Sequence, residues 1–329
     1  MRRVSLKFLD DYGESVKYKY IFGPVPSRRL GTSLGIDLTP QNACTLNCLY
    51  CECGRTRNVT SVRREYVPTG EVLTELRDFL STYPILDSIT FSGSGEPTLH
   101  SGIEDIIEML KDEYPQYRVT VLTNGTLLTD ASVRAALRRA DLVVPSLDAV
   151  SEDVFRKINR PLHGLRNEEI IEGLVAFSEE YPGEIWLEVF IIPGINDNED
   201  ELLRFRKLFP RLRATRIQLN SLDRPGAVDW ILPMPRENLE ALARRLGDAV
   251  EVIGKPMLRH RCAAYSDDVE NRILAAVRVR PYTLEDVCVA LDMHPLDAGK
   301  YLDVLLNEGK LISKKGERGV FYMSSREER

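Results

Sequence analysis

Runs of apolar and β-branched residues alternate with amphipathic segments from about residue 32 to about residue 256. The runs have the length and composition of buried strands, and the segments between them carry apolar residues at helical spacing. The predicted strands are Ser33–Leu38, Ser88–Phe91, Arg118–Thr123, Leu142–Ser146, Ile185–Ile192 and Arg216–Asn220. The predicted helices are Pro68–Tyr83, Ile103–Tyr114, Asp130–Arg139, Asn167–Glu180, Asp200–Leu208 and Pro235–Leu246.

A strand–helix unit is therefore repeated six times. Such a repeat predicts an α/β protein with a parallel sheet and helices outside it. Six units are too few for a closed eight-unit barrel, so we expect a partial (β/α)6 TIM-like barrel. A flat, doubly wound sheet is the alternative, because its strands and helices alternate along the chain in the same way.

The pattern changes after about Pro256. Helices are predicted from Asp267 to Val279, from Thr283 onward and from His294 to Asn307, and short strands at Lys310–Ser313 and Gly319–Met323. Three helices followed by a two-stranded hairpin resemble a winged helix-turn-helix module. We therefore expect an N-terminal extension (residues 1–20), a core domain (21–257), and a linker with a winged-helix domain (258–329).

The composition and charge of the chain argue against several classes of protein. Of the 329 residues, 43% are hydrophobic and 29% are charged, which is ordinary for a globular protein. No apolar run is long enough to predict a membrane span, and the N-terminus does not resemble a secretory signal, so we expect a cytoplasmic protein. The formal net charge of −6 argues against a protein whose whole surface binds nucleic acid.

Four of the six cysteines, namely Cys44, Cys48, Cys51 and Cys53, fall within ten positions, while Cys262 and Cys288 stand alone. Without an export signal a disulfide framework is not expected, so the close thiols predict a metal site. The first three have C-x3-C-x2-C spacing in a loop after the first predicted strand. Three thiolates can hold a [4Fe–4S] cluster with one iron left open, whereas a fourth from Cys53 would complete a structural zinc site.

The C-x3-C-x2-C spacing, with Tyr50 directly before its third cysteine, resembles the signature of the radical S-adenosylmethionine (SAM) superfamily. The segment from Phe22 to Asp37 is similar to the lead-in of archaeal wyosine-synthase-like Fe–S oxidoreductases, and the resemblance covers roughly residues 21–257. It implies that Cys44, Cys48 and Cys51 hold a [4Fe–4S] cluster whose open iron binds SAM. Reductive cleavage of SAM would give a 5′-deoxyadenosyl radical that takes hydrogen from a substrate, with ferredoxin or flavodoxin as the electron donor.

The same resemblance places SAM at the ends of several predicted strands. Gly93–Pro97 matches the segment that binds the SAM amino group, with Ser94 where the common motif has glycine. Glycines permit close backbone approach, and a carboxylate suits an ammonium. Arg160 is a further candidate, because a guanidinium can hold a carboxylate by a bidentate pair. The candidate SAM-binding residues are Tyr50, Gly93, Ser94, Gly95, Glu96, Pro97, Thr123, Asn124, Ser146, Asp148, Arg160, Ile192, Pro193 and Gly194.

The substrate is less clearly indicated. Residues 266–329 hold ten Lys and Arg against twelve Asp and Glu, and acids on the third predicted helix would repel phosphates, so sequence-specific DNA binding is not expected. A basic stretch from Arg204 to Arg216, with the wyosine-like resemblance, favours tRNA modification as one hypothesis. Arg28 and Arg29 of the lead-in are expected near the cluster. Radical modification of a small metabolite or peptide, and a non-enzymatic Fe–S or zinc regulator that acts through the winged helix, are the alternatives.

Overall fold

The computed structural model describes residues 8–9, 15–16, 18–40, 42–254, 269–291, 293 and 295–325. Cys262, the predicted helix start at Asp267 and most of the N-terminal extension lie outside these residues. Two short strands of the extension, β1 (Phe8–Leu9) and β2 (Ser15–Val16), form an antiparallel pair.

The centre of the molecule is an eight-stranded sheet with the order β12-β11-β10-β9-β8-β7-β4-β3. All of its pairings are parallel except the one between β3 and β4. Every residue of β7 and of β9 is buried, as expected for parallel strands covered on both faces. The strands are β3 (Ile21–Ser27), β4 (Gly31–Ile36), β7 (Ser88–Phe91), β8 (Val119–Thr123), β9 (Leu142–Pro145), β10 (Glu184–Phe190), β11 (Arg216–Asn220) and β12 (Val250–Val252).

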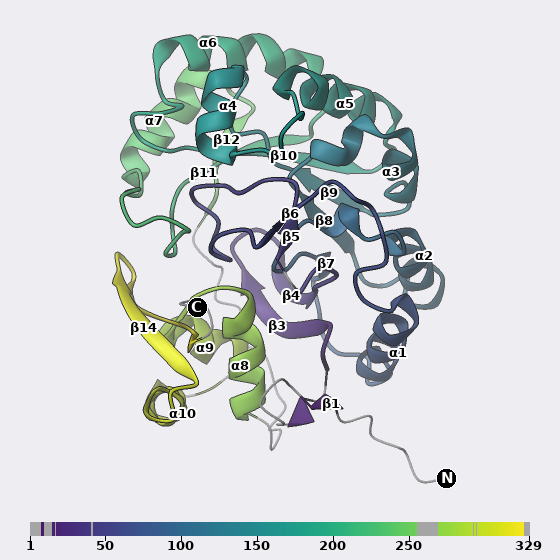
Figure 1. Cartoon of the computed structure of the whole chain (residues 1–329), viewed down its shortest axis with the longest axis vertical. Helices are drawn as coiled ribbons and strands as arrows, with labels where there is room; N and C mark the ends of the chain where they lie inside the picture. Colours follow the sequence, from purple (N-terminus) through teal and green to yellow (C-terminus); the bar gives the residue numbers. More distant parts are fainter. Residues whose placement is uncertain are drawn as a thin grey trace.

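From β4 to β12 the spatial order of the strands follows their order in the chain. A doubly wound sheet needs a point where this order reverses, and the sheet has none between β4 and β12. The helices therefore follow one another as an arc around the strands, and the prediction of an open, partial barrel is confirmed (Figure 1). The helices of the arc are α1 (Thr69–Leu80), α2 (Ile103–Glu113), α3 (Ala131–Ala136), α4 (Glu152–Asn159), α5 (Asn167–Glu180), α6 (Glu199–Leu208) and α7 (Arg236–Leu246).

The six predicted strands and six predicted helices of the core are all present, with bounds that shift by a few residues. Among the elements that were not predicted, β3 and β12 lie at the two edges of the sheet, and α4 is a helix of eight residues that ends where Arg160 takes a left-handed φ of 45°. β12, with three residues, and α4 carry too little periodicity to stand out in the sequence.

Residues 269–325, which we call the C-terminal unit, contain the three predicted helices and the predicted hairpin. A strand that was not predicted, β13, joins them in a sheet of order β13-β15-β14. The core of the unit includes Phe22 and Val25 of β3, so the unit packs against the edge of the barrel sheet (Figure 1). Within the described residues, no helix is long and apolar enough to cross a membrane. The elements are α8 (Val269–Val279), β13 (Tyr282–Thr283), α9 (Leu284–Leu291), α10 (Pro295–Asn307), β14 (Leu311–Gly316) and β15 (Gly319–Ser324).

Candidate active site

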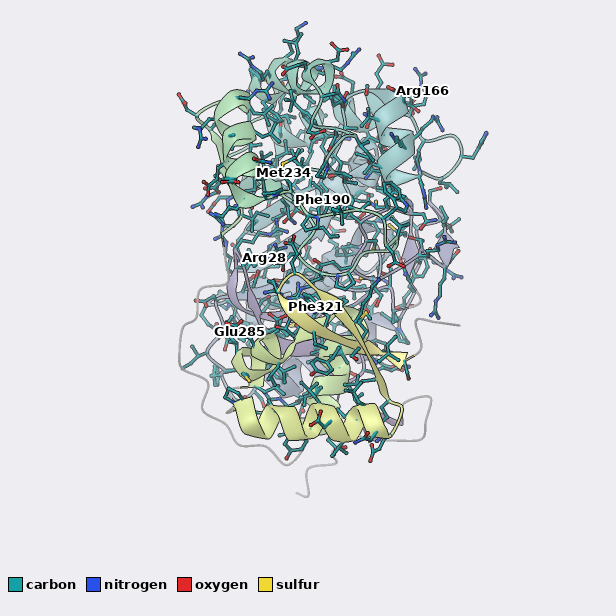
Figure 2. The ribbon with its side chains drawn as sticks, turned by 90° about the vertical axis from the view of Figure 1, so that its left-hand side faces the viewer. Arg28, Arg166, Phe190, Met234, Glu285 and Phe321 are labelled. Atoms are coloured by element: carbon teal, nitrogen blue, oxygen red, sulfur yellow. The ribbon has the colours of Figure 1, made fainter. Side chains whose placement is uncertain are left out.

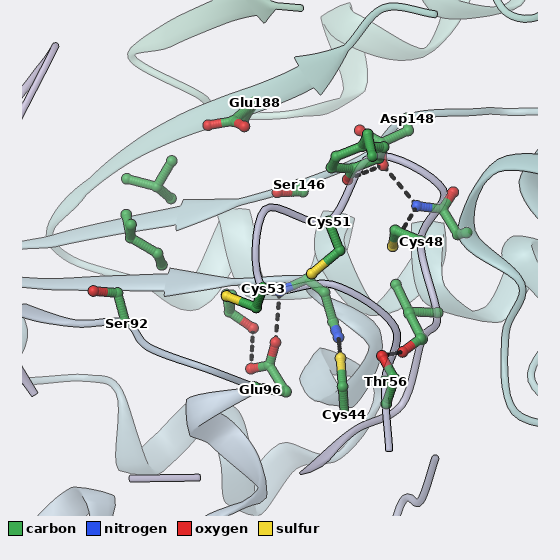
Figure 3. A pocket seen from close by; sticks show the side chains of 18 of the residues that line it. Cys44, Cys48, Cys51, Cys53, Thr56, Ser92, Glu96, Ser146, Asp148 and Glu188 are labelled. Carbon is green, nitrogen blue, oxygen red and sulfur yellow. Dashed lines mark hydrogen bonds between the residues drawn. The ribbon is translucent and has the colours of Figure 1, made fainter. Parts of the chain in front are cut away.

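The loop after β4 brings the three cysteines of the motif into one pocket of about 270 Å³ (Figure 3). This cysteine loop (residues 42–60) is closed at its two ends and is also held at its middle. Its strand β5 (Ala43–Cys44) pairs with β6 (Asn58–Val59), and the amide of Leu49 donates to the carbonyl of Ile158 on α4 at 2.9 Å. The pocket lies at the carboxyl ends of the parallel strands, where β/α barrels carry their chemistry.

Two asparagines donate hydrogen bonds to the sulfur atoms. The Nδ2 of Asn124 lies 3.3 Å from the Sγ of Cys44, and the Nδ2 of Asn159 lies 3.4 Å from the Sγ of Cys48. In the protein without metal, burial raises the pKa of the Cys44 thiol to about 12 and that of Cys48 well above its usual value. Loading a metal must therefore expel protons from these thiols.

The thiols fit a cluster better than a single ion. Cys44, Cys48 and Cys51 line one cavity, but among the described residues no three His, Cys, Asp or Glu side chains converge as the ligands of one ion would. A cluster of several atoms spreads its ligands more widely than a single ion does. The amide donors on two of the sulfurs also suit anionic thiolates, since hydrogen bonds to a charged acceptor are the stronger ones.

Glu96 organises the turn that follows β7. It is buried, and its Oε1 accepts from the amide and hydroxyl of Thr98 and from the hydroxyl of Thr123, while its Oε2 accepts, among the described residues, only the amide of Asn124 at 2.7 Å. Oε2 therefore keeps a free lone pair for a ligand in the pocket. Gly95 makes the turn possible, because a Cβ there would lie 2.1 Å from the carbonyl oxygen of Ala43.

A second carboxylate, Asp148, lies across the pocket after β9. Its Oδ2 accepts from the hydroxyl of Tyr50 at 2.5 Å and from Asn159 at 2.6 Å, and its Oδ1 accepts the amide of Phe190 at 2.9 Å. The ring of Tyr50 stacks on that of Phe190 with centroids 3.8 Å apart. Tyr50 is therefore fixed in position directly beside the third cysteine.

The interior of the barrel below the cysteines carries a buried ion pair. Arg29, from the turn between β3 and β4, makes a close ion pair with Glu188 of β10, and Asn220 of β11 donates to the other oxygen of Glu188 at 3.2 Å. Although burial alone would raise it, Arg29 holds the pKa of Glu188 below its usual value. Both residues line the pocket.

Most of the candidate residues from the sequence meet in this pocket. The three motif cysteines line it together with Tyr50, Gly93, Ser94, Gly95, Glu96, Thr123, Asn124, Ser146 and Asp148. The structure does not bring five other candidates into the lining, namely Pro97, Arg160, Ile192, Pro193 and Gly194. Arg160 is exposed at the end of α4, where it terminates the helix in a left-handed conformation, and it does not line the pocket.

Glu188 was missed in the sequence, and Asn159 and Asn196, although they lie in candidate segments, were not chosen as site residues. Asn159 contacts both a cysteine and Asp148, and Asn196 holds the backbone at the ends of β9 and β10. The signal for Glu188 was its charge among the otherwise apolar residues 185–190 of β10. A charged residue in a buried parallel strand needs a partner, and Arg29 had already been singled out.

The fold and the pocket together define a partial-barrel protein with three cysteine thiols in one pocket at the carboxyl ends of its strands. The radical SAM superfamily model matches residues 38–206, and the chain belongs to this superfamily. It is therefore an enzyme that uses a [4Fe–4S] cluster and SAM.

The chain is similar to two curated proteins over most of its length. It is 33% identical over 313 residues to a UPF0026 protein of Methanocaldococcus jannaschii, and the match covers 92% of this chain and 95% of that one. It is 32% identical over 298 residues to a Brachyspira hyodysenteriae protein named GTPase Obg, where the match covers 90% of this chain but only 44% of the relative.

Among solved structures, a radical SAM methyltransferase from Sphaerobacter thermophilus superposes with a TM-score of 0.51 at 20% identity. The match covers 67% of this chain and 66% of the methyltransferase. At 20% identity this similarity supports a shared fold and nothing further.

Proposed function

We propose that the chain cleaves SAM reductively and uses the product radical to take a hydrogen atom from a small substrate inside the barrel. Cys44, Cys48 and Cys51 would hold the cluster. When bound, the reduced cluster supplies one electron that splits SAM into methionine and a 5′-deoxyadenosyl radical, which becomes 5′-deoxyadenosine on taking hydrogen from the substrate. The convergence of the three thiols with Glu96 and Asp148 in one pocket carries the proposal.

In this scheme the chain's own residues bind and orient the cluster and SAM. Asn124 and Asn159 donate to two cluster ligands and stabilise their negative charge. The free lone pair of Glu96 accepts a hydrogen bond from the SAM ammonium. Tyr50, held by Asp148 and by its stack on Phe190, forms a flat wall beside the third cysteine. These fixed contacts orient SAM and exclude water from the radical.

A small substrate is favoured over a folded RNA by what covers the pocket. The loop after β11 (residues 221–235) places Leu222, Val228 and Ile231 against the cysteine loop. Two cations of the C-terminal hairpin point to the core, where Lys314 makes a close ion pair with Asp229, and Arg318 lies 3.0 Å from Asp223.

In the basic stretch predicted from the sequence, two arginines are paired with acids. Arg211 bonds Glu172 at 2.8 Å, and Arg216 lies 3.5 Å from Glu251. A folded RNA could reach this pocket only by extruding a nucleotide. The Arg29–Glu188 pair instead offers a donor and an acceptor side by side to a small polar substrate.

The test is anaerobic reconstitution with iron and sulfide, followed by electron paramagnetic resonance (EPR) of the dithionite-reduced protein with and without SAM. We expect a reduced [4Fe–4S] signal that changes when SAM is added, and 5′-deoxyadenosine in the reaction mixture. Alanine at Cys44, Cys48 or Cys51 should abolish both. Cys288→Ala is the matched control, because this thiol lies in the C-terminal unit outside the pocket. Wild-type turnover by any of the three motif variants would refute the assignment.

The substrate proposal has its own test. Deuterium should enter 5′-deoxyadenosine from a deuterated extract of metabolites but not from purified deuterated RNA. Transfer from RNA alone, together with co-purified RNA that dissociates as salt rises, would refute the small-substrate proposal in favour of RNA modification.

A further inference from the structure

The C-terminal unit is joined to the cysteine loop through a buried arginine. Arg224, in the loop after β11, is 6% exposed. Its Nη1 lies 3.0 Å from Asp286 of α9 and also donates to the carbonyl of Pro281, and its Nε lies 3.6 Å from Glu52, the residue after Cys51. One guanidinium therefore connects the barrel, the cysteine loop and the C-terminal unit.

The charges around Arg224 form ion pairs that cross the boundary between the barrel and the C-terminal unit. Arg318 of the hairpin lies 3.0 Å from both Asp286 and Asp223, and Arg28 reaches the same Asp223 at 3.8 Å. Burial alone would raise the pKa of Asp286, but Arg224 and Arg318 hold that pKa below its usual value. Undocking would separate Asp286 from Arg224 and Asp223 from Arg318, and Figure 2 shows Arg28 near the boundary between barrel and hairpin.

Cys53 makes a second connection at the same place. Its Sγ lies 3.1 Å from the carbonyl oxygen of Val279, the last residue of α8, and 3.3 Å from that of Gly93. The single thiol proton can be donated to either carbonyl, so it links the cysteine loop to the C-terminal unit or to the turn that leads to Glu96. The same side chain lines the pocket beside the three motif cysteines.

We propose that the C-terminal unit is a structural part of the active site, and that Arg224 and Cys53 are positioning residues that fix the cysteine loop against it. The proposal rests on the proposed function, because it concerns the same cluster. Arg224 acts through Glu52 on the segment that carries Cys51, and Cys53 acts as a hydrogen-bond donor and not as a fourth ligand. The unit therefore stabilises the loop that holds the metal.

The first test compares two ion pairs that cross the same interface. Arg224→Met keeps the length of the side chain but removes a buried charge, whereas Lys314→Met removes the exposed pair with Asp229, whose side chain is 82% exposed. Hydrogen–deuterium exchange of amides in the cysteine loop should rise about tenfold or more in R224M and stay near wild type in K314M. Cluster content after reconstitution should fall in R224M alone. Equal exchange and equal iron in the two variants would overturn the proposal.

The second test uses Cys53 and holds even if R224M folds poorly. Cys53→Ser keeps a donor for the two carbonyls, and Cys53→Ala removes it. A positioning role predicts near-wild-type iron content and EPR spectrum for C53S, and faster loop exchange with lower iron content for C53A. Equal cluster loss in both variants would show a fourth ligand, and no change in either would show that the thiol is dispensable; both results overturn the proposal.

These outcomes are separable from those of the proposed function. If the wild-type protein gives no SAM-responsive cluster signal, the proposed function fails. The exchange of the loop amides can still be measured in that case, because it needs no cluster.

Discussion

Asn196 allows a sharp test of how the ends of β9 and β10 are held. Its side chain is fully buried and makes three hydrogen bonds to backbone. The Nδ2 donates to the carbonyls of Asp148 at 2.8 Å and Phe190 at 2.7 Å, and the Oδ1 accepts the amide of Ile192 at 2.8 Å. Asn196→Asp keeps the shape and the acceptor but places a carboxylate oxygen against two carbonyl oxygens.

The cost follows from those two carbonyls. A buried polar group left without its partner costs roughly 1–3 kcal/mol, so two of them predict a loss of roughly 2–6 kcal/mol in the free energy of unfolding near pH 7.5. Burial also raises the pKa of the introduced carboxyl in the folded state. The folded variant therefore binds this proton more readily than the unfolded variant does, so N196D should regain stability as the pH falls toward 5. The protonated acid can then donate one of the lost hydrogen bonds.

Urea unfolding at pH 7.5 and pH 5.5, followed by the fluorescence of the buried Trp186, measures this effect. Asn196→Ala should be destabilised without regaining stability at low pH, because it introduces no titrating group. Asn198→Asp is the matched control. Asn198 caps α6 by accepting the amide of Glu201 at 3.0 Å, and aspartate caps a helix as well as asparagine does. Destabilisation of N196D by less than about 1 kcal/mol, or equal losses in N196D and N198D, would refute the reasoning.

Three further predictions concern other parts of the core. Arg29→Met should lower the free energy of unfolding by about 3–5 kcal/mol in urea, because it leaves Glu188 buried and unpaired. A second change, Glu188→Leu, should restore much of this free energy, and additive losses would contradict a coupled pair. Burial lowers the pKa of His100, whose Nδ1 accepts the amide of Tyr66 at 3.0 Å, so the wild type should lose stability as the pH falls below about 6.5. His100→Asn, which keeps an acceptor, should lose less stability than the wild type over the same pH range, and an equal loss of stability would exclude His100 as the cause. Gly95→Ala should lower cluster content and stability through the contact with Ala43, and normal iron content in G95A would show that the turn can shift.

The barrel could be predicted because its strands are continuous apolar runs separated by clear amphipathic helices. The runs at Ser88–Phe91 and Arg216–Asn220 are strands with those bounds. The number of units favoured a partial barrel over a flat sheet, but only the spatial order of the strands, which alternation alone does not encode, decides between the two. β3 was missed because Pro24 and Pro26 are unusual in a strand and are tolerated only at a sheet edge.

The site could be predicted where its residues lie in local motifs. The cysteines, Glu96, Asn124 and Asp148 each lie in a segment that follows a strand of the sheet, and the pocket brings them together. The Arg29–Glu188 pair joins residues 159 positions apart, and the Arg224–Asp286 pair joins two parts of the chain that looked like separate domains. Such contacts depend on tertiary structure, and no spacing in the sequence reveals them. The winged-helix assignment of the C-terminal unit stays a prediction.

The position of β3 also affects any attempt to shorten the protein. β3 is the outermost strand of the sheet on its side, and α8 and α9 pack over its apolar side chains Phe22 and Val25. An uncovered edge strand offers unpaired backbone groups to other molecules, and this leads to aggregation. A chain cut at the apparent domain boundary near residue 257 would uncover this edge together with its apolar surface. The boundary that the sequence suggests is therefore a poor place to separate the barrel for expression, and a soluble fragment would need new polar residues at Phe22 and Val25.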